Sequence, residues 1–430
     1  MRFSRRKFLA GAASLAVLGV LPAAAFAGGR RPKHVILVDW DGFDPDYLGR
    51  VPTPNLDSLA SRGSLSTIRG TYHTISNPSR ASMSTGAYPE VHDNAAYIYD
   101  PSTNRAQGQS RFLAAETIAE TLAAEGKTLA SVQWYMVQDH GATYGDPEHL
   151  YVQPGGSFDN RVDAAIEILN QRPVDSGGQM VTVPKIPDFM AVYSSDLDGA
   201  GHENGAESPV VDATLAESDR QLGRLIQATK DVGIYGEVAW MLTSDHGMTS
   251  WDRTLMPQVL ATITAAGYVP EIVTPGRSPA PETEVIIVPN GVRIGDFTLR
   301  GKAATPEAKQ ELRAALEGMA EIQRVFDDSD LDALRASEKL GDLVAEAKPP
   351  WGFVLSEPEP GQERGSHSSL SEIELPLLLA GAGVRRGVPP KDADLTDVAP
   401  TIAHLLGVRP PADAQGRALT EALGAPGPRD

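Results

Sequence analysis

Five short segments of the chain contain seven side chains that can bind a divalent metal ion or act as a nucleophile. The segments span residues 38–43, 76–80, 198–202, 243–248 and 365–367. The candidate ligands within them are Asp41, Ser76, Asp198, His202, Asp245, His246 and His367. Carboxylates and imidazoles are typical ligands of a catalytic zinc site. Together with one serine hydroxyl, they predict metal-assisted hydrolysis of a phosphate ester.

Ser76 is the expected nucleophile. Pro78 suits the first turn of a helix and Asn77 suits its cap, so Ser76 is expected just ahead of a helix N-terminus. Free amide groups favour a phosphate oxygen there. A serine hydroxyl needs an activator, and no His or Lys lies beside Ser76 in the sequence, so a metal ion is expected to activate it. Arg80, one turn into the helix, is expected to reach back to the same phosphate as a bidentate donor.

The remaining candidates differ in spacing. Asp198 and His202 lie four residues apart with two glycines between them, which suits either a helical turn or a tight loop. Asp245 and His246 are adjacent, so both can face one site only if the backbone turns, as the glycine that follows permits. The other six histidines (residues 34, 73, 92, 140, 149 and 404) are interpreted as structural or surface residues, although residue 73 stays open because it is close to the nucleophile.

Buried strands are expected to position these side chains. Four near-continuous apolar runs occur at residues 34–39, 189–194, 238–243 and 375–380. Helical patterns lie between them, at residues 111–124, 161–169 and 211–230. Runs that are apolar on both faces indicate a parallel sheet covered by helices, so the sequence predicts an α/β fold with a mostly parallel central sheet and helices on both faces. Four candidates (41, 198, 245 and 246) follow strand ends, where ligands bind in such folds.

Two further segments bear on the organisation of the chain. A proline-rich stretch at residues 268–284 interrupts the strand–helix pattern. We expect residues 261–340 to form a smaller inserted α+β cap subdomain, and residues 28–260 and 341–430 to form the core.

Residues 1–27 are predicted to be a twin-arginine signal peptide. Arg5 and Arg6 precede an apolar run, and Ala25-Phe26-Ala27 is a cleavage pattern. A membrane anchor is the alternative, but the run is only moderately apolar. We expect export through the bacterial twin-arginine translocon to the periplasm or beyond, with no stable membrane insertion of the mature chain.

The amino-acid composition of the chain excludes several kinds of chemistry and argues against one class of partner. The chain has no cysteine, which excludes disulfides, thiolate catalysis and cysteine zinc sites. Its formal net charge is -18, and removal of the predicted signal, with four basic residues and no acid, makes this -22. Such a charge argues against nucleic acid as a main partner. A small phosphate ester remains compatible, because two divalent cations would dominate the local field.

Together the segments resemble the alkaline phosphatase superfamily, most closely its nucleotide pyrophosphatase/phosphodiesterase branch. The resemblance covers nearly all of the expected mature chain except the insert. It implies two Zn²⁺ ions, the first held by Asp41, Ser76, Asp245 and His246, and the second by Asp198, His202 and His367. It also implies attack by Ser76 and a phosphoseryl intermediate.

The nucleophile segment departs from that branch, which usually has threonine followed by Phe-Pro-Asn. Here Ser76-Asn77-Pro78-Ser79 lacks the aromatic that packs on a nucleotide base, and Ser79 replaces the asparagine donor to the phosphate. The segment also resembles the sulfatase signature. A formylglycine-dependent sulfatase or phosphonate monoester hydrolase is therefore one alternative. A non-catalytic exported metal-binding protein of the same fold is another, although all seven ligand positions are present.

Overall fold

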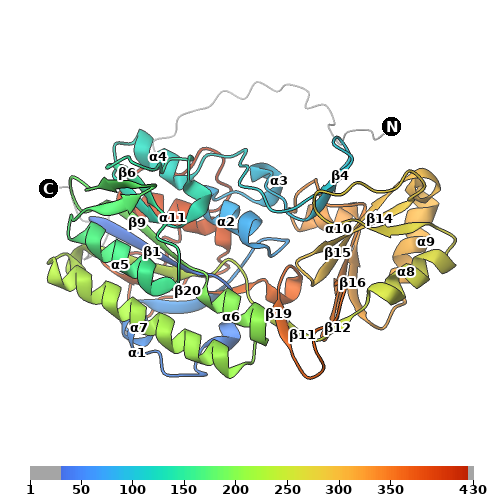
Figure 1. Ribbon diagram of the computed structural model, residues 1–430. Coiled ribbons are helices and arrows are strands. Elements are labelled where there is room, and N and C mark those ends of the chain that lie inside the picture. The colour runs from blue at the N-terminus through green and yellow to red at the C-terminus, as the bar shows by residue number, and fades with distance from the viewer. Residues whose placement is uncertain (1–30, 425–430) are drawn as a thin grey trace.

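The computed structural model describes residues 31–424, so the predicted signal peptide lies outside the described residues. Figure 1 shows a central sheet between helices, and its seven strands have the order β2-β20-β10-β1-β9-β5-β6. The strands are β1 (His34–Trp40), β2 (Ser64–Arg69), β5 (Leu129–Val132), β6 (His149–Val152), β9 (Phe189–Ser194), β10 (Val238–Thr243) and β20 (Glu374–Gly381). The four predicted apolar runs are therefore strands of one sheet.

Strands β10, β1, β9, β5 and β6 run parallel to one another, which confirms the predicted mostly parallel sheet. Strand β20 runs antiparallel to both of its neighbours, β10 and β2. The inference of a parallel strand was therefore wrong for residues 375–380. An apolar run indicates burial on both faces of a sheet, but it contains no information about strand direction.

Helices cover both faces of this sheet (Figure 1). One face packs against α1 (Pro54–Ala60), α5 (Phe158–Leu169), α6 (Asp196–Asn204) and α7 (Pro209–Asp231). The other face packs against α2 (Ser76–Thr85), α4 (Ile118–Ala124) and α11 (Val398–Leu406). Side chains of β1 alternate between the two cores, as the pleat requires: Ile36 and Val38 join one, Val35 and Leu37 the other.

One helix is shorter than the sequence predicted. The pattern at residues 111–124 predicted a single helix, but α4 begins only at Ile118. Thr117 Oγ1 accepts a hydrogen bond from the Glu120 amide at 3.1 Å, and the Glu120 carboxylate accepts one from the Thr117 amide at 2.8 Å. This capping box fixes the helix start.

A second, five-stranded sheet lies beside the first (Figure 1). Its order is β13 (Pro270–Ile272), β14 (Val285–Asn290), β15 (Ile294–Leu299), β17 (Leu343–Ala347) and β16 (Ile322–Phe326), packed with α8 (Met256–Ala265), α9 (Pro306–Glu317) and α10 (Asp328–Ala333). The predicted limits of 261 and 340 cut through α8 and leave out β17. Those limits need correction, because β17 pairs with β15 and β16.

Short pairings connect the two sheets. Strand β11 (Thr249–Trp251) pairs with β19 (Arg364–Ser366), and β12 (Arg253–Thr254) pairs with β18 (Trp351–Gly352). The α-helix and strands that remain are α3 (Pro89–His92) and the hairpins β3–β4 (Ile98–Asp100, Arg105–Gln107) and β7–β8 (Val174–Ser176, Gln179–Val181). Within residues 31–424, no helix has the length and apolar character needed to cross a membrane.

Candidate active site

The ends of three neighbouring strands bring the acidic candidates together. Asp41 directly follows β1, and Asp245 and His246 follow β10, whose Thr243 is in register with Asp39 of β1. Asp198 lies in the first turn of α6, just past β9, and its amide donates to the Asp41 carbonyl at 3.0 Å. The sequence left open whether Asp198 and His202 form a loop or a helical turn; they lie on this helix.

A glycine permits this close approach. Gly42 has φ +69°, and a Cβ there would lie 2.9 Å from the Cα of Asp198. A larger residue would be strained in this left-handed conformation and would collide with backbone. The Asp-Gly pair therefore lets the loop after β1 meet the first turn of α6.

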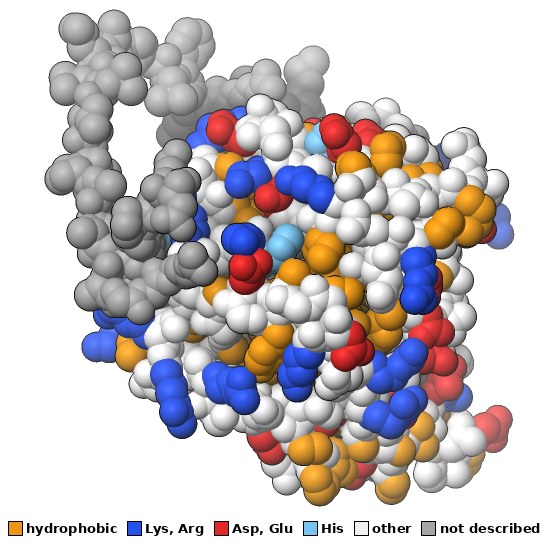
Figure 2. Space-filling view, turned by 90° about the vertical axis from the view of Figure 1, so that its left-hand side faces the viewer, with side chains coloured by type: hydrophobic (Ala, Val, Ile, Leu, Met, Phe, Trp, Pro, Cys, Tyr) orange, Lys and Arg blue, Asp and Glu red, His pale blue; other side chains and the backbone are white. Residues whose placement is uncertain are grey.

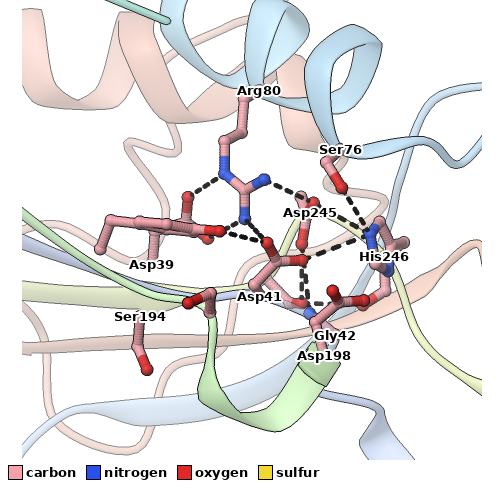
Figure 3. A network of polar contacts seen from close by, with 12 residues as sticks. Asp39, Asp41, Gly42, Ser76, Arg80, Ser194, Asp198, Asp245 and His246 are labelled. Carbon is pink, nitrogen blue, oxygen red and sulfur yellow. Dashed lines mark hydrogen bonds and ion pairs between the residues drawn. The ribbon is translucent and has the colours of Figure 1, made fainter. Parts of the chain in front are cut away.

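The first group of candidate ligands surrounds the Nε2 atom of His246 (Figure 3). This atom lies 3.2 Å from Ser76 Oγ, 3.3 Å from Asp41 Oδ1 and 3.1 Å from Asp245 Oδ2. Ligands bound tetrahedrally at about 2.0–2.1 Å from zinc lie about 3.3–3.4 Å from one another. Each of the three side chains that the resemblance implied as ligands beside His246 therefore lies at such a distance from its Nε2 atom.

The second group centres on Asp198. Its Oδ1 atom lies 3.1 Å from His202 Nε2 and 3.7 Å from His367 Nε2. Asp198 also groups with Asp41 and His246, with ligand atoms within 4.8 Å of one another. The structure thus brings all seven sequence-predicted ligands into one site, and Asp198 lies between the two groups.

All three histidines expose Nε2 and bind a backbone carbonyl through Nδ1. The partners are Gly247 O for His246 at 3.0 Å, Gly365 O for His202 at 2.8 Å, and Thr74 O for His367 at 2.6 Å. A carbonyl only accepts hydrogen bonds, so Nδ1 carries the proton and the Nε2 lone pair faces the site in the neutral ring. This is the arrangement that orients histidines for metal binding.

Two buried carboxylate oxygens also indicate that the site can bind a cation. Asp41 Oδ1 and Asp198 Oδ1 are buried and have no hydrogen-bond partner among the described residues. An unsatisfied buried acceptor costs about 1–3 kcal/mol, and more if it is charged. Divalent cations at the two groups would satisfy both oxygens, so the donor set fits metal ions.

The pKa values of His246, Asp198 and Asp41 also indicate that the site favours a positive charge. Burial disfavours a charged His246, yet Asp245 and Asp41 outweigh it and raise the pKa of this imidazole to about 10. Burial also acts against Asp198, but His202 lowers the pKa of its carboxyl to about 2. Burial raises the pKa of Asp41 well above its usual range, against the effect of Arg80. The carboxylates therefore hold a proton on His246, and a bound metal ion would have to displace that proton.

The structure places Arg80 differently from the expectation that it would bind the phosphate. Its side chain is fully buried, and its guanidinium binds Asp39 at 2.6 Å, Asp41 at 3.0 Å and Asp245 at 3.0 Å (Figure 3). It is directed at two carboxylates of the first ligand group and at the neighbouring carboxylate of Asp39. The spacing of one helical turn predicted the direction of the side chain, but not which anion it meets.

Sequence reasoning missed three residues that support this group. Asp39 binds Arg80, Tyr193 donates its hydroxyl to Asp41 Oδ2 at 2.6 Å, and the Tyr135 hydroxyl accepts from Arg80 at 2.9 Å. Asp39 had a signal, because residues i and i+2 of a strand share a face and Asp39 precedes Asp41 by two. The tyrosines come from other strands and loops, and no spacing connects them with the site.

The two residues after the nucleophile that differ from the family pattern are turned inward. Asn77 donates through its side-chain amide to the Ser110 carbonyl at 2.6 Å. The side chain of Ser79 is buried, and its hydroxyl has no hydrogen-bond partner among the described residues. Asn77 is therefore held by a backbone carbonyl, whereas the Ser79 hydroxyl is not held by a described residue.

Comparison with known proteins agrees with this geometry. Residues 35–370, which include all seven candidate ligands, match the family described as Type I phosphodiesterase / nucleotide pyrophosphatase. A bis(5'-adenosyl)-triphosphatase of Homo sapiens is 23% identical over 88% of this chain and 79% of that protein. Ectonucleotide pyrophosphatase/phosphodiesterase family member 5 of Homo sapiens is 28% identical over 50% of this chain, and the match spans only 45% of that protein.

Solved structures show the same fold. Murine ectonucleotide pyrophosphatase/phosphodiesterase 5 aligns with a TM-score of 0.65 at 21% identity, over 88% of this chain and 96% of that one. An inactive variant of the same protein, in complex with AMP, aligns with a TM-score of 0.67. Since the family match extends over most of the chain and over every candidate ligand, the chain belongs to the type I phosphodiesterase/nucleotide pyrophosphatase family of phosphoric ester hydrolases, within the alkaline phosphatase superfamily.

Proposed function

We propose that this protein is an exported two-zinc phosphodiesterase that acts through a phosphoseryl intermediate at Ser76. The observation that carries the proposal is the convergence of Ser76 Oγ, Asp41 Oδ1 and Asp245 Oδ2 on His246 Nε2, all within 3.1–3.3 Å. A hydroxyl held among metal ligands is poised to be both a ligand and a nucleophile.

Ser76 begins α2, and its hydroxyl faces His246. In the reaction Ser76 loses its proton to water, its Oγ forms a bond to phosphorus, and the bond from phosphorus to the leaving oxygen breaks. The leaving group takes a proton from water. A second water then attacks phosphorus and loses a proton as the bond from phosphorus to Oγ breaks, and Oγ takes up a proton from solvent to regenerate the serine.

Asp41, Asp245 and His246 would hold one zinc ion with Ser76, and Asp198, His202 and His367 would hold the other. When bound, the two ions would lower the pKa of the Ser76 hydroxyl and offset negative charge on the phosphoryl oxygens. The protein residues keep the ligand atoms in place through the three Nδ1 contacts to backbone carbonyls. The α2 N-terminus adds a favourable environment for the phosphoryl oxygens.

Nucleotide-bearing diesters are the first substrates to test. Relatives are named bis(5'-adenosyl)-triphosphatases, and a similar solved structure contains AMP. Asn77 replaces the expected aromatic, and its side chain is bound to the Ser110 carbonyl. No stacking of a nucleotide base is therefore expected at this position. We therefore expect hydrolysis of phosphodiesters with weak discrimination between bases.

A panel of p-nitrophenyl esters tests the reaction: phosphate, phenylphosphonate, thymidine phosphate and sulfate. We expect hydrolysis of phosphorus esters, lost on chelation and restored by zinc. Ser76→Ala should lower kcat by at least about 10³-fold, since the covalent route is removed, whereas the control Ser76→Thr keeps a hydroxyl and should retain measurable turnover.

Two outcomes would reject the assignment. Robust turnover by Ser76→Ala would mean that another group attacks phosphorus. Sulfate ester hydrolysis, together with a peptide mass two hydrogens lower at residue 76, would favour the formylglycine alternative. Export is tested separately: replacing Arg5 and Arg6 by lysine should retain the protein in the cytoplasm, while unchanged export would reject the twin-arginine route.

A further inference from the structure

We propose that Asp39 and Arg80 form a buried positioning pair that determines which carboxylate oxygens face the first group of metal ligands. The inference rests on the proposed function, because the pair has this role only if Asp41, Asp245 and His246 hold an ion. It gives Arg80 a role other than phosphate binding, and it adds Asp39, which belongs to neither ligand group.

The N–H groups of Arg80 are directed at acceptors within the protein. Nε donates to Asp39 Oδ2 at 2.6 Å, and Nη2 lies 3.4 Å from the other oxygen of Asp39. Nη2 also lies 3.0 Å from Asp41 Oδ2, while Nη1 contacts Asp245 Oδ2 at 3.0 Å and the Tyr135 hydroxyl at 2.9 Å. The contacts to Asp39 and Tyr135 are hydrogen bonds and those to Asp41 and Asp245 are ion pairs, so the guanidinium is surrounded by protein groups.

These contacts orient the two ligand carboxylates. Asp41 Oδ2 receives both Arg80 and the Tyr193 hydroxyl, which leaves Oδ1 to face His246 Nε2 at 3.3 Å. Asp245 Oδ2 lies between Arg80 and His246, at 3.0 and 3.1 Å. Without the guanidinium, either carboxylate could rotate and present its other oxygen. Arg80 therefore fixes the orientation of the Asp41 and Asp245 carboxylates.

Asp39 holds the guanidinium in turn and balances its charge. The side chains of Asp39 and Arg80 are both fully buried, and Figure 3 shows the contact between them. The Arg80 guanidinium carbon also lies 4.5 Å from the ring centre of Tyr193 and 5.3 Å from that of Tyr135. An unpaired guanidinium beside a divalent cation would repel it, whereas the Asp39–Arg80 pair is neutral overall. The pair thus contributes orientation with little net charge.

Three variants separate positioning from plain structural support. Arg80→Lys keeps the charge but loses the planar fork that binds two carboxylates at once. Asp39→Asn keeps the shape of Asp39 but leaves Arg80 with an excess positive charge. The double variant D39L/R80M removes both charges and keeps an apolar volume. The measurements are zinc stoichiometry and affinity, by competition with a chelator, and the thermal midpoint of each metal-free protein.

We expect the Lys and Asn variants to bind one zinc ion with wild-type affinity and the other 10- to 100-fold more weakly, the range typical of residues that orient metal ligands. The double variant should melt near the wild-type midpoint and still bind the first ion weakly. Wild-type affinity at both positions in the Lys variant, or in the double variant, would overturn the positioning role. A wild-type protein that binds no zinc or hydrolyses no ester would instead reject the proposed function itself.

Discussion

The two groups of candidate ligands are adjacent but lie in different surroundings. In the first group the side chains of Asp245 and His246 are fully buried, and that of Asp41 is 4% exposed. In the second group the His202 side chain is 39% exposed and that of Asp198 is 18% exposed. The metal-ligand candidates at the ends of β1 and β10 are therefore buried, whereas His202 and Asp198 border solvent and His367 is only 6% exposed.

The supports of the two groups differ in the same way. The first group extends from the ends of β1 and β10, adjacent strands of the main sheet, and is held by Asp39 and Arg80. In the second group, His202 lies on α6 and His367 follows β19. The turn between β14 and β15 holds the His367 segment, since Ser368 donates to Asn290 O at 2.7 Å and Val292 forms a bridge with His367.

This difference predicts unequal metal binding. Ligands fixed by a sheet are preorganised, whereas ligands from a helix and a loop depend on how the second sheet packs against the first. Solvent also reaches the second group more easily. We therefore expect the first ion to bind tightly and the second to exchange quickly.

The largest expected effect comes from alanine at the histidine of each group. His246→Ala should remove the first ion and lower kcat by at least about 10³-fold, because Ser76 loses its activating environment. His202→Ala should remove only the second ion and lower kcat by about 10²-fold. Zinc content and kinetics of the two purified variants, measured side by side, check the difference.

Slow titration of the wild-type protein with a chelator gives the matching observation. One zinc ion per chain should leave at low chelator concentration and the second only at much higher concentration. Simultaneous loss of both ions, or equal zinc content in the two variants, would break the proposed asymmetry between the groups.

The buried helix α2, which begins at Ser76, should also make the protein sensitive to acid through its contact with His92. His92 contacts Ser82 of α2 through Nε2 at 2.9 Å, and burial lowers the pKa of its imidazole to about 3. The unfolded chain binds a proton on this residue below about pH 6.5, whereas the folded protein stays neutral there. Stability is therefore present near pH 7 and is lost as the pH falls from about 6.5 toward 3.

The histidine contribution between pH 7 and pH 4 is on the order of 3 kcal/mol. His92→Gln should make the stability of the metal-free protein less dependent on pH over this range. Denaturant unfolding at several pH values, with a chelator present throughout, measures the free energy of unfolding for both proteins. Parallel pH profiles for the variant and the wild type would show that His92 does not contribute to acid sensitivity.

The sequence predicted the residues of the first ligand group better than the residues that hold them in place. Apolar runs ending in acids indicated that Asp41 and Asp245 would meet at one edge of a parallel sheet, and they do. The role of Arg80 was not predictable, because the same helical position can direct a guanidinium at a phosphate or at carboxylates. Only the tertiary structure, which brings Arg80 beside Asp39 of β1, decides between these anions.

The surroundings of the second group were harder to predict for another reason. The contact between His367 and the β14–β15 turn joins residues far apart in the chain, and strand direction cannot be inferred from composition. The limit placed at 261 cuts through α8, and the limit placed at 340 failed because β17 is an apolar strand like those of the main sheet. Nothing local in its sequence shows which of the two sheets it joins.

The smallest expected effect tests the contact on which the second group depends. A Cβ at Gly365 would lie 2.5 Å from the Gly201 carbonyl oxygen, so Gly365→Ala must push β19 away from α6. His202 Nδ1 binds the Gly365 carbonyl at 2.8 Å, and the shift should separate His202 from His367. We expect about tenfold weaker binding of the second ion, equivalent to about 1.4 kcal/mol, with the first ion unaffected. Gly199→Ala is the matched control on α6, since nothing beyond its chain neighbours and its own helix backbone lies within 4 Å of the added Cβ and alanine favours a helix. If chelator competition gave the two alanine variants equal zinc affinities, the packing of β19 on α6 would not be what holds the second group together.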